Sequence, residues 1–335
     1  MDSVQRILVL FTALAILVGC ETQPGSSLPN TNKPIVNIGR LICGGHLPLA
    51  IVEKRFQQDL KTFQLKTIQN HDWNDVVDDM RSGKLAGTFI LSPLAMDLIR
   101  NGLEAKIVLK ADRNGNSFVL SNKFRSINDL NRTRSIIAVP HLYSQHHVLL
   151  RLALDQHNVD HNKISVVAMP PRDMINSMKQ GEIDGFVVGE PEANKSISMG
   201  EGWMAAISPE IWKDHMDHVF IASDHFIEGH PEQLQELVNV LVKSGQFIES
   251  NPKISAAMGE DYTGSAASVF EKVLTTPPDW IDYSDMMMTE KDLQQMSEKM
   301  VEMRLWDTLP VDMTVYYDNR FLNKALSQSL AYSSQ

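Results

Sequence analysis

One motif occurs twice in this chain, at a constant offset of 98 residues. Residues 80–93 read MRSGKLAGTFILSP, and residues 178–191 read MKQGEIDGFVVGEP. In each copy a glycine suited to a left-handed C-cap ends a helix, a β-rich run follows, and a proline opens the next helix. The period exceeds that of solenoid repeats, which run to roughly 20 to 50 residues. We therefore predict two similar α/β lobes rather than a repeat array.

The two copies end in polar residues that should face a common cleft. In open α/β sheets, ligands bind beyond the carboxyl ends of the strands. Ser92 follows the first β-rich run, and Glu190 follows the second. We expect both side chains to lie at the cleft, Ser92 at a helix N-terminus and Glu190 just before the next helix. The alternative is that two unrelated βα units resemble each other by chance.

The composition fits a globular protein of two domains. The chain has 335 residues, 43% of them apolar and 21% charged, which suffices for two cores of ordinary size. The formal net charge is -10, and no block of Lys and Arg is present. Nucleic acid is therefore not an expected partner, because phosphate binding requires such a block.

The N-terminus is typical of an exported lipoprotein. Arg6 precedes an apolar run over residues 7–18, which is too short for a bilayer span of roughly 20 residues and fits a signal-peptide core. The run closes on LVGC at 17–20, which resembles the lipobox of bacterial lipoproteins. We expect a signal peptide over residues 1–19 and lipidation of Cys20. A plain signal peptide or an uncleaved membrane anchor is the alternative.

A lipid on Cys20 would place the protein in the cell envelope, lipid-anchored on the periplasmic or extracytoplasmic face. Residues 20–34 are polar and rich in Pro and Ser, as in a flexible tether. Cys43 then has no partner for a disulfide, because the chain has only two cysteines. We expect Cys43 to be a small buried residue at a strand end.

The order of predicted elements divides the chain into a discontinuous first lobe and a continuous second lobe. Residues 35–122 and 218–335 are assigned to lobe 1, and residues 123–217 to lobe 2. The hinge is expected within 112–117 and 218–221. Helices are predicted at Pro231–Glu249, Tyr262–Leu274 and Thr289–Met303, all packing on lobe 1.

Three predicted helices begin at the expected cleft, and polar residues stand at their N-termini. His46 precedes the first, Ser92 opens the second, and Ser144 and Gln145 begin the third. Unpaired amides and the helix dipole at such N-termini favour an anion. Lys213 is the nearest basic candidate for neutralising its charge. The simpler alternatives are a loop histidine, a serine that only caps its helix, and a lysine on a surface turn.

The motifs together resemble a known family. The runs SGKLAGTFILSPLAM, RNGNS, MKQGEIDGFVVGEP and IWKDH, in this order after a lipobox, are similar to the nitrate/sulfonate/bicarbonate branch of periplasmic substrate-binding proteins of ABC importers. The resemblance covers roughly residues 35–249 and is closest to the nitrate and bicarbonate binders. It implies the type II periplasmic-binding-protein fold, in which two α/β lobes around a hinge close over one small ligand.

The resemblance also implies site residues. Trp73 would lie near the pocket, Ser92 and Glu190 at the two switch points, and Asn116 on the hinge strand. One loop departs from the nitrate-binder pattern. It is usually rich in glycine, whereas residues 140–147 read PHLYSQHH, which hinders close approach of backbone amides to an anion.

The expected function is capture of a small anion or anionic small molecule and its delivery to an ABC permease and ATPase complex by a monomer. A ligand sensor that reports to a membrane kinase or regulator is the alternative. No enzyme activity, cofactor or metal is expected. Histidines pair at 146–147 and at 215 and 218, so zinc or nickel binding is the minor alternative, but no HExxH motif or Cys/His cluster accompanies them. The Cys/His-rich segment of the pyrimidine-synthesis enzymes that resemble this family is also missing.

Overall fold

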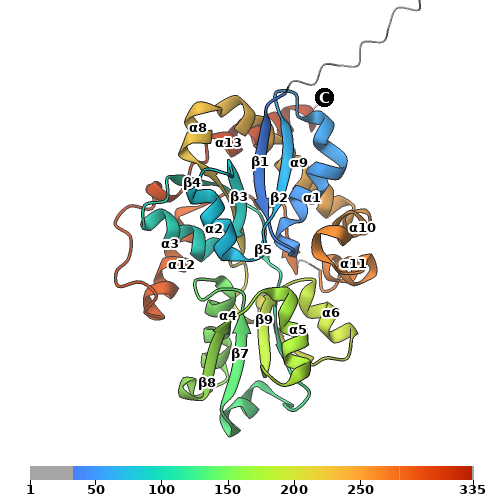
Figure 1. Ribbon diagram of the computed structural model, residues 1–335, viewed down its shortest axis with the longest axis vertical. Coiled ribbons are helices and arrows are strands. Elements are labelled where there is room, and N and C mark those ends of the chain that lie inside the picture. The colour runs from blue at the N-terminus through green and yellow to red at the C-terminus, as the bar shows by residue number, and fades with distance from the viewer. Residues whose placement is uncertain (1–32, 279, 334–335) are drawn as a thin grey trace, which may run out of the picture. The chain divides into compact units, whose positions relative to one another are not determined.

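Two five-stranded mixed sheets organise the chain in the computed structural model, which describes residues 33–278 and 280–333 (Figure 1). The first sheet has the order β2-β1-β3-β11-β4 and the second the order β10-β6-β9-β7-β8; a short ladder joins β5 and β12. We name the lobe around each sheet the first and the second lobe. The strands are β1 (Ile35–Arg40), β2 (Gln64–Gln69), β3 (Gly87–Leu91), β4 (Ala105–Lys110), β5 (Arg113–Asn114), β6 (Asn116–Leu120), β7 (Ser135–Val139), β8 (Ile164–Ala168), β9 (Gly185–Gly189), β10 (Trp203–Ile207), β11 (His218–Ser223) and β12 (Ile281–Asp282).

The two sheets have the same topology. In the first, β1 pairs in parallel with β2 and β3, and β11 runs antiparallel to β3 and β4. In the second, β7 pairs in parallel with β8 and β9, and β6 runs antiparallel to β9 and β10. The motif copies form the corresponding units around β3 and β9. Gly83 and Gly181 both have a positive φ after the preceding helix, as a left-handed C-cap requires. The prediction of two similar α/β lobes is confirmed.

Helices cover both faces of each sheet (Figure 1). α1, α9, α10, α11 and α13 share the core on one face of the first sheet, and α2, α3 and α12 share the core on the other. α4 and α7 lie on one face of the second sheet, with α5 and α6 on the other. The helices are α1 (Leu47–Ile51), α2 (Trp73–Arg81), α3 (Ser92–Arg100), α4 (Gln145–Gln156), α5 (Pro171–Gln180), α6 (Glu192–Ser198), α7 (Ser208–Ile211), α8 (Asp224–Gly229), α9 (Pro231–Ser250), α10 (Pro252–Thr263), α11 (Ala267–Thr275), α12 (Glu290–Glu302) and α13 (Arg320–Ser333).

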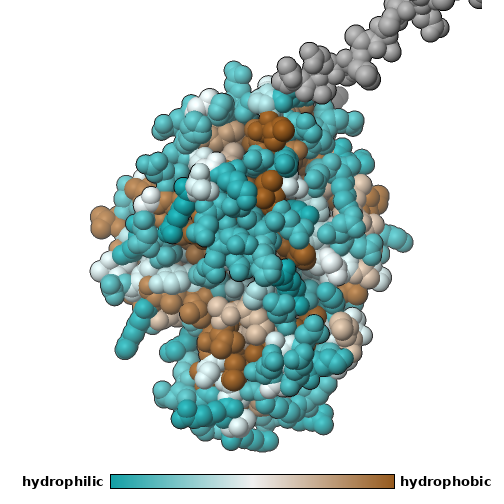
Figure 2. All heavy atoms as spheres, in the orientation of Figure 1, coloured by the Kyte–Doolittle hydropathy of each residue, from teal (hydrophilic) through white to brown (hydrophobic). Residues whose placement is uncertain are grey.

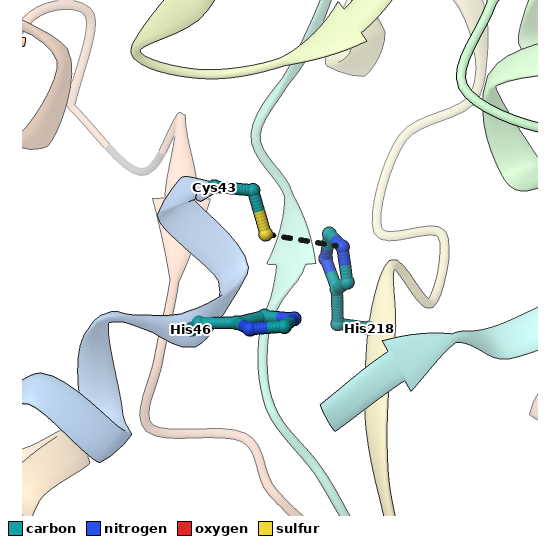
Figure 3. A group of neighbouring side chains, drawn as sticks. All are labelled: Cys43, His46 and His218. Atoms are coloured by element: carbon teal, nitrogen blue, oxygen red, sulfur yellow. Dashed lines mark hydrogen bonds between the residues drawn. The ribbon is translucent and has the colours of Figure 1, made fainter. Parts of the chain in front are cut away.

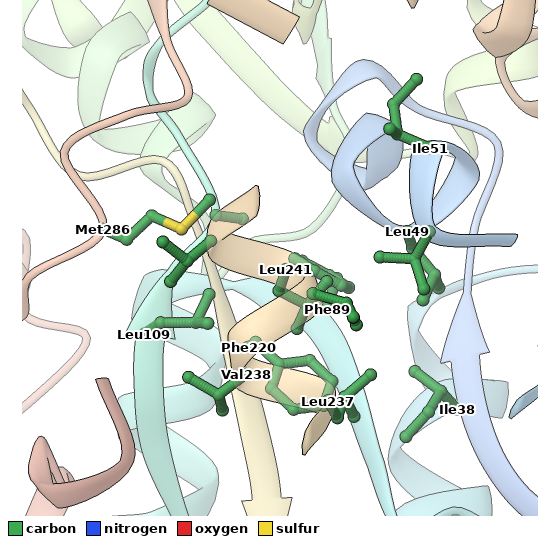
Figure 4. Close-up of a cluster of buried hydrophobic side chains, with 14 of the residues drawn as sticks. Ile38, Leu49, Ile51, Phe89, Leu109, Phe220, Leu237, Val238, Leu241 and Met286 are labelled. Atoms are coloured by element: carbon green, nitrogen blue, oxygen red, sulfur yellow. The ribbon is translucent and has the colours of Figure 1, made fainter. Parts of the chain in front are cut away.

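The largest core fills the space between the first sheet and α9. Phe89 on β3 and Phe220 on β11 lie with ring centroids 5.1 Å apart, both fully buried. Leu237 and Leu241 of α9 point at these rings (Figure 4). Burial of such a side chain contributes about 1.5–3 kcal/mol, so this cluster fixes β3, which leads to Ser92, and β11, which begins at His218.

The chain crosses between the two sheets twice. It leaves β4 through residues 111–115 to reach β6, and it returns from α7 through residues 212–217 to reach β11. β6 belongs to the second sheet. The first segment of the first lobe therefore ends before Asn116, and not at residue 122 as the sequence predicted. Residues from Lys33 onward form one compact unit. Hinge motion about the two crossings therefore stays a prediction.

One predicted helix has the wrong range, and one strand was missed. The predicted helix Tyr262–Leu274 spans the end of α10 and most of α11, because Gly264 takes a positive φ of 63° and stops the first of them. The strand β10 was not predicted, since its WMAAI sequence has neither strict alternation nor β-branched enrichment before Ile207. The helix after Thr289 is confirmed, with a capping box between Thr289 and Asp292.

The visible face of the protein in Figure 2 is mostly hydrophilic, with hydrophobic residues in scattered patches. Within the described ranges, none of the helices combines the length and the apolarity that a membrane crossing needs. The expected signal peptide and the lipidation site Cys20 lie outside the described residues.

Candidate functional site

A small cavity lies where the two lobes meet, at the carboxyl ends of β1, β7 and β9. Its volume is about 20 Å³, and a second cavity of about 30 Å³ adjoins it along the segment after β1. The repeat predicted a cleft at this edge of both sheets. The first cavity is lined from both lobes by Ile42, Cys43, Trp73, Pro140, His146, Pro171, Val188, Gly189, Glu190, Pro191, Glu192, His218 and Thr263.

Glycines bring the segment after β1 close to both lobes. A Cβ on Gly44 would lie 2.0 Å from the carbonyl oxygen of Glu190, and one on Gly45 would lie 2.2 Å from Nδ1 of His218. Only glycine permits these approaches without displacement. The turn Gly44–His46 that results places Cys43 and His46 next to each other, with both side chains facing the ring of His218 (Figure 3).

His218, at the start of β11, is held by two buried carboxylates. Its Nδ1 lies 3.1 Å from Asp217 and 3.4 Å from Asp112. Burial alone would lower the pKa of His218, but the charge of Asp217 next to it raises that pKa well above the ordinary value. Burial and the neighbouring Asp217 raise the pKa of Asp112 to about 6, whereas His218 keeps the pKa of Asp217 low against the effect of burial. His218 is therefore an imidazolium that lies between the ionised carboxylate of Asp217 and the carboxyl group of Asp112, which is protonated more readily.

Several buried ring nitrogens near this cluster have no hydrogen-bond partner. They are Nε2 of His46, Nε1 of Trp73 and both ring nitrogens of His146. Nδ1 of His46 accepts the Leu41 amide at 2.9 Å, so a neutral His46 carries its proton on Nε2. Burial lowers the pKa of His146 to about 3 and also lowers that of His46, so both rings are neutral at pH 7. Unpartnered buried donors are uncommon, and a ligand in the adjoining cavity would account for this group of them.

Glu190 closes the cavity from the second lobe. Its carboxylate accepts hydrogen bonds from the Ser117 hydroxyl at 2.6 Å and from the Asn194 amide at 3.0 Å. Burial raises the pKa of Glu190 to about 7 in spite of these bonds. The side chain can therefore be protonated or ionised near neutral pH, and its charge state changes the potential inside the cavity.

The structure brings three of the predicted site residues together. Trp73 and Glu190 line the cavity, and the ring of His46 lies 6.1 Å from that of Trp73 and 5.6 Å from that of His218, centroid to centroid. Trp73 is placed by the N-cap Asp72, which accepts the amides of Asn74 and Asp75.

Four other predicted residues surround the cavity without lining it. Ser92 binds the backbone of residues 216–217 through its amide and hydroxyl. Ser144 caps α4 by accepting the His147 amide. Gln145 donates to the Asp217 carboxylate across the lobes. Asn116 contacts His215, its Nδ2 lying 3.0 Å from Nε2.

Lys213 lies apart from the others. Its exposed side chain lines a separate groove at the second crossing, with Arg113 and Asp285. At two of the three expected helix N-termini one amide is already paired, since Ser92 N donates to the carbonyl of Asp217 and Gly44 N donates to the carbonyl of Glu190.

Sequence reasoning missed Cys43, His146 and His218 as cavity residues. Cys43 was expected to be buried, yet it is half-buried and lines both cavities. Its position just beyond β1, at the edge where ligands bind, was the available signal. Nothing in the spacing of Cys43 and His218, 175 residues apart, could have joined them.

Solved structures share this fold. The ligand-binding component of an ABC-type import system from Staphylococcus aureus, solved with zinc bound, has a TM-score of 0.80 and 20% identity, covering 88% of this chain and 99% of that one. The desulfurization enzyme DszB has a TM-score of 0.65 and 11% identity, covering 89% of this chain and 100% of that one. The fold is that of two-lobed periplasmic substrate-binding proteins, and at least one enzyme has it too.

The chain belongs to the NMT1-like family, which it matches over residues 30–260. The nitrate import ATP-binding protein NrtC of Synechocystis sp. is 26% identical over 68% of this chain and 37% of its own length. The nitrate/nitrite binding protein NrtA of Nostoc sp. is 23% identical over 78% of this chain and 66% of its own length. The chain thus spans about a third to two thirds of these curated relatives. The resemblance drawn from the sequence motifs is confirmed at the level of the family.

Proposed function

We propose that this protein is the substrate-binding component of an ABC importer. It captures a small anion, or a small molecule with one anionic group, between its lobes and delivers it to a permease. Membership of the NMT1-like family and the likeness to nitrate import proteins support this function. The candidate ligands are nitrate, bicarbonate, a sulfonate or a similar anion.

The observation that carries the proposal is the set of unpartnered donors at the cleft. Nε2 of His46 and Nε1 of Trp73 are buried without acceptors, and the imidazolium of His218 lies beside them. A buried donor without a partner costs about 1–3 kcal/mol, and hydrogen bonds to a charged group contribute about 1.5–3 kcal/mol each. An anion that accepts hydrogen bonds from these groups removes the cost of the unpartnered donors and forms bonds that are strengthened by its charge. This gain offsets the repulsion by the negative net charge of the protein.

The proposed partners are a membrane permease and its ATPase, with this protein acting as a monomer. A lipid on Cys20 would hold it at the extracytoplasmic face. Labelling cells with a radioactive fatty acid tests the anchor, since label should appear in the wild type and vanish in Cys20→Ala. Label retained in that variant contradicts the anchor but leaves ligand capture untouched.

The sensor alternative has no specific observation in its favour, because the curated relatives named above are import proteins. An enzymatic role is not proposed either. The desulfurization enzyme with the same fold is 11% identical, which supports a shared fold and nothing further.

A thermal-shift screen tests the ligand class. The full chain is heated with nitrate, nitrite, bicarbonate, alkanesulfonates, short carboxylates and cationic amines, in the presence of a chelator. A ligand at about 100 times its dissociation constant should add about 2.7 kcal/mol to the free energy of unfolding. Stabilisation by one or more anions is expected. Stabilisation by cationic amines alone would show that the anion assignment is wrong.

A further inference from the structure

Gly189 lines the cavity and leaves an open space in front of two buried polar side chains. It ends β9 and pairs with Asn116 at the start of β6. A Cβ on Gly189 would lie 3.6 Å from Oδ1 of Asn116 and 3.7 Å from Nε2 of His146. Apart from the chain neighbours of Gly189, the described residues bring no other atom within 4 Å of that position. A small group of a bound ligand can therefore occupy this space.

Oδ1 of Asn116 is a buried acceptor that lacks a donor. The side chain is 0% exposed, and Oδ1 has no hydrogen-bond partner. Nδ2 lies 3.0 Å from the carbonyl oxygen of Asn114 and 3.0 Å from Nε2 of His215. The reverse orientation of the amide would bring two acceptor oxygens together at Asn114, so the oxygen must face the space beside Gly189. An amide oxygen only accepts, and the group that pairs with it must carry an O–H or N–H.

His146 adds a nitrogen that can either donate or accept. The residue is 2% exposed, and neither ring nitrogen has a partner. Burial lowers the pKa of His146 to about 3, so the ring is neutral at pH 7 and offers one N–H and one lone pair. A hydroxyl beside Gly189 can therefore donate to Asn116 and accept from His146. An oxygen without a hydrogen would repel the Asn116 oxygen.

The polar groups of the cavity differ between the two lobes. The first lobe supplies the imidazolium of His218 and the unpartnered donors Nε2 of His46 and Nε1 of Trp73. The second lobe adds a further unpartnered acceptor, Oε1 of Glu192, which also lines the cavity. Lys195, 3.5 Å from the other oxygen of Glu192, favours the ionised form of this carboxylate. A ligand should therefore direct its negative charge to the first lobe and a hydrogen to the second.

We propose that the ligand is a small monoanion that carries an O–H or N–H of its own, and that Asn116 and His146 select for that group in the space beside Gly189. The inference rests on the proposed capture of an anion and narrows the class of that anion. Acceptor-only anions, such as nitrate, leave Oδ1 of Asn116 unpaired. A site with a buried polar group discriminates strongly against ligands that leave it unpaired.

Anions of matched shape test this selection. Bicarbonate, nitrate and acetate are planar monoanions of similar size, but only bicarbonate donates a hydrogen bond. Sulfamate and methanesulfonate form a second pair, in which an amino group replaces a methyl group. Isothermal titration calorimetry of the full chain at pH 7, in a sealed cell, measures the five affinities. The donating member of at least one set should bind at least about tenfold more tightly than its acceptor-only counterparts.

The possible results separate this inference from the proposed function. Acceptor-only anions that bind as tightly as their donating counterparts overturn the inference and leave anion capture intact. No binding by any of the five anions overturns both, because the inference depends on anion capture.

Gly189→Ala tests the location of the selecting group. Its methyl would lie at ordinary contact distances from Asn116 and His146, so the variant should fold, which a circular dichroism melt checks. The methyl fills the space, so the preference for the donating anion should fall by at least about tenfold. His146→Leu, which removes both ring nitrogens, should lower the same preference.

Gly229→Ala is the matched control, because its Cβ would meet only the His225 ring at 3.7 Å or more. Its preference should stay within about twofold of the wild type. An unchanged preference in Gly189→Ala would contradict the placement of the O–H or N–H beside Gly189.

Discussion

The backbone amide of Gly44 in the first lobe donates a hydrogen bond of 3.1 Å to the carbonyl oxygen of Glu190 in the second lobe. This contact joins the turn after β1 to the end of the second motif copy. A Cβ on Gly44 would lie 2.0 Å from that oxygen, far inside van der Waals contact. The closeness of the lobes at the cavity therefore depends on a residue without a side chain.

The first prediction is that Gly44→Ala disfavours the closed arrangement of the lobes. The methyl group can be accommodated by opening about the crossings, so the variant should fold normally. Its apparent ligand affinity should fall by about tenfold or more, because only the closed fraction binds tightly. Isothermal titration calorimetry with the anion found in the screen measures this loss.

X-ray scattering checks the mechanism of that loss. Saturating ligand should shrink the radius of gyration of the wild type and shrink that of Gly44→Ala less. Gly229→Ala is the control, because its Cβ would meet only His225 at an ordinary 3.7 Å. An unchanged wild-type radius at saturation would argue against closure about residues 111–115 and 212–217.

The second prediction separates binding from packing at Trp73. Trp73→Phe keeps an aromatic ring in the core but removes an Nε1–H that has no partner in the protein. Anion affinity should fall by about ten- to a hundredfold, the value of one hydrogen bond to a charged group. The free energy of unfolding should fall only by the cost of the smaller ring in the core, without the further cost of a lost hydrogen bond. Calorimetry and urea unfolding measure the two quantities.

Trp306→Phe gives the opposite pattern and serves as the control. Its Nε1 donates to Asp97 at 2.8 Å, and it is nearly as buried as Trp73. Loss of that bond should destabilise the fold by about 1–3 kcal/mol without affecting anion affinity. Unchanged affinity in Trp73→Phe would remove Trp73 from the binding site.

The fold was predictable because its signals are local. Proline and glycine mark the ends of the helices around β3 and β9, and the offset of the two copies fixes the second lobe once the first is known. The break between α10 and α11 was missed because its only marker is Gly264 within a run of helix-forming residues.

The centre of the site was not predictable, because its contacts are distant in sequence. Asp112 comes from the first crossing, Asp217 and His218 from the second, and Cys43 from the end of β1. Each residue alone has an ordinary sequence context. The pKa values of these groups depend on their being buried next to one another. Neither hydrophobic periodicity nor the spacing of residues in the sequence reveals that proximity.

The third prediction concerns the buried ion pairs that hold α12 to the first sheet. Lys110 is fully buried, and its Nζ lies 3.0 Å from Asp285 and 3.2 Å from Asp292. Lys110→Met should lower the free energy of unfolding by about 3 kcal/mol, the low end for breaking a buried pair, because Arg113 still contacts both carboxylates. Urea unfolding at pH 7 measures the change.

A partly exposed pair on α12 provides the control for that experiment. Lys299 lies 2.7 Å from Glu302, whose side chain is 60% exposed. Lys299→Met should cost less than about 1 kcal/mol, as exposed pairs do. Equal costs for the two variants would mean that the Lys110 pairs do not stabilise the fold.

The fourth prediction is a pH dependence that Glu190→Gln removes. Burial raises the pKa of Glu190 from 4.5 to about 7 in the folded protein. Below pH 4.5 the group is protonated in both the folded and the unfolded state, so it affects stability little. As the pH rises toward 7, the unfolded state ionises freely while the folded state resists. The wild type should therefore lose up to roughly 3 kcal/mol relative to Glu190→Gln across this interval.

Urea unfolding of the wild type and Glu190→Gln at several pH values from 4 to about 8 measures the difference between their free energies of unfolding. Taking this difference removes the effect of every titrating group that the two proteins share. Glutamine can keep the contacts of Glu190, because the hydroxyl of Ser117 and the side-chain amide of Asn194, which donate to the carboxylate, can turn to accept from the glutamine amide. Glu182→Gln, which alters an exposed carboxylate of the same lobe, should follow the wild type.

Anion affinity should fall in the wild type as the pH rises through about 7, since Glu190 then adds a negative charge at the cavity, and it should fall less in Glu190→Gln. Parallel stability curves for the wild type and Glu190→Gln would show that the pKa of Glu190 is not raised in the folded protein.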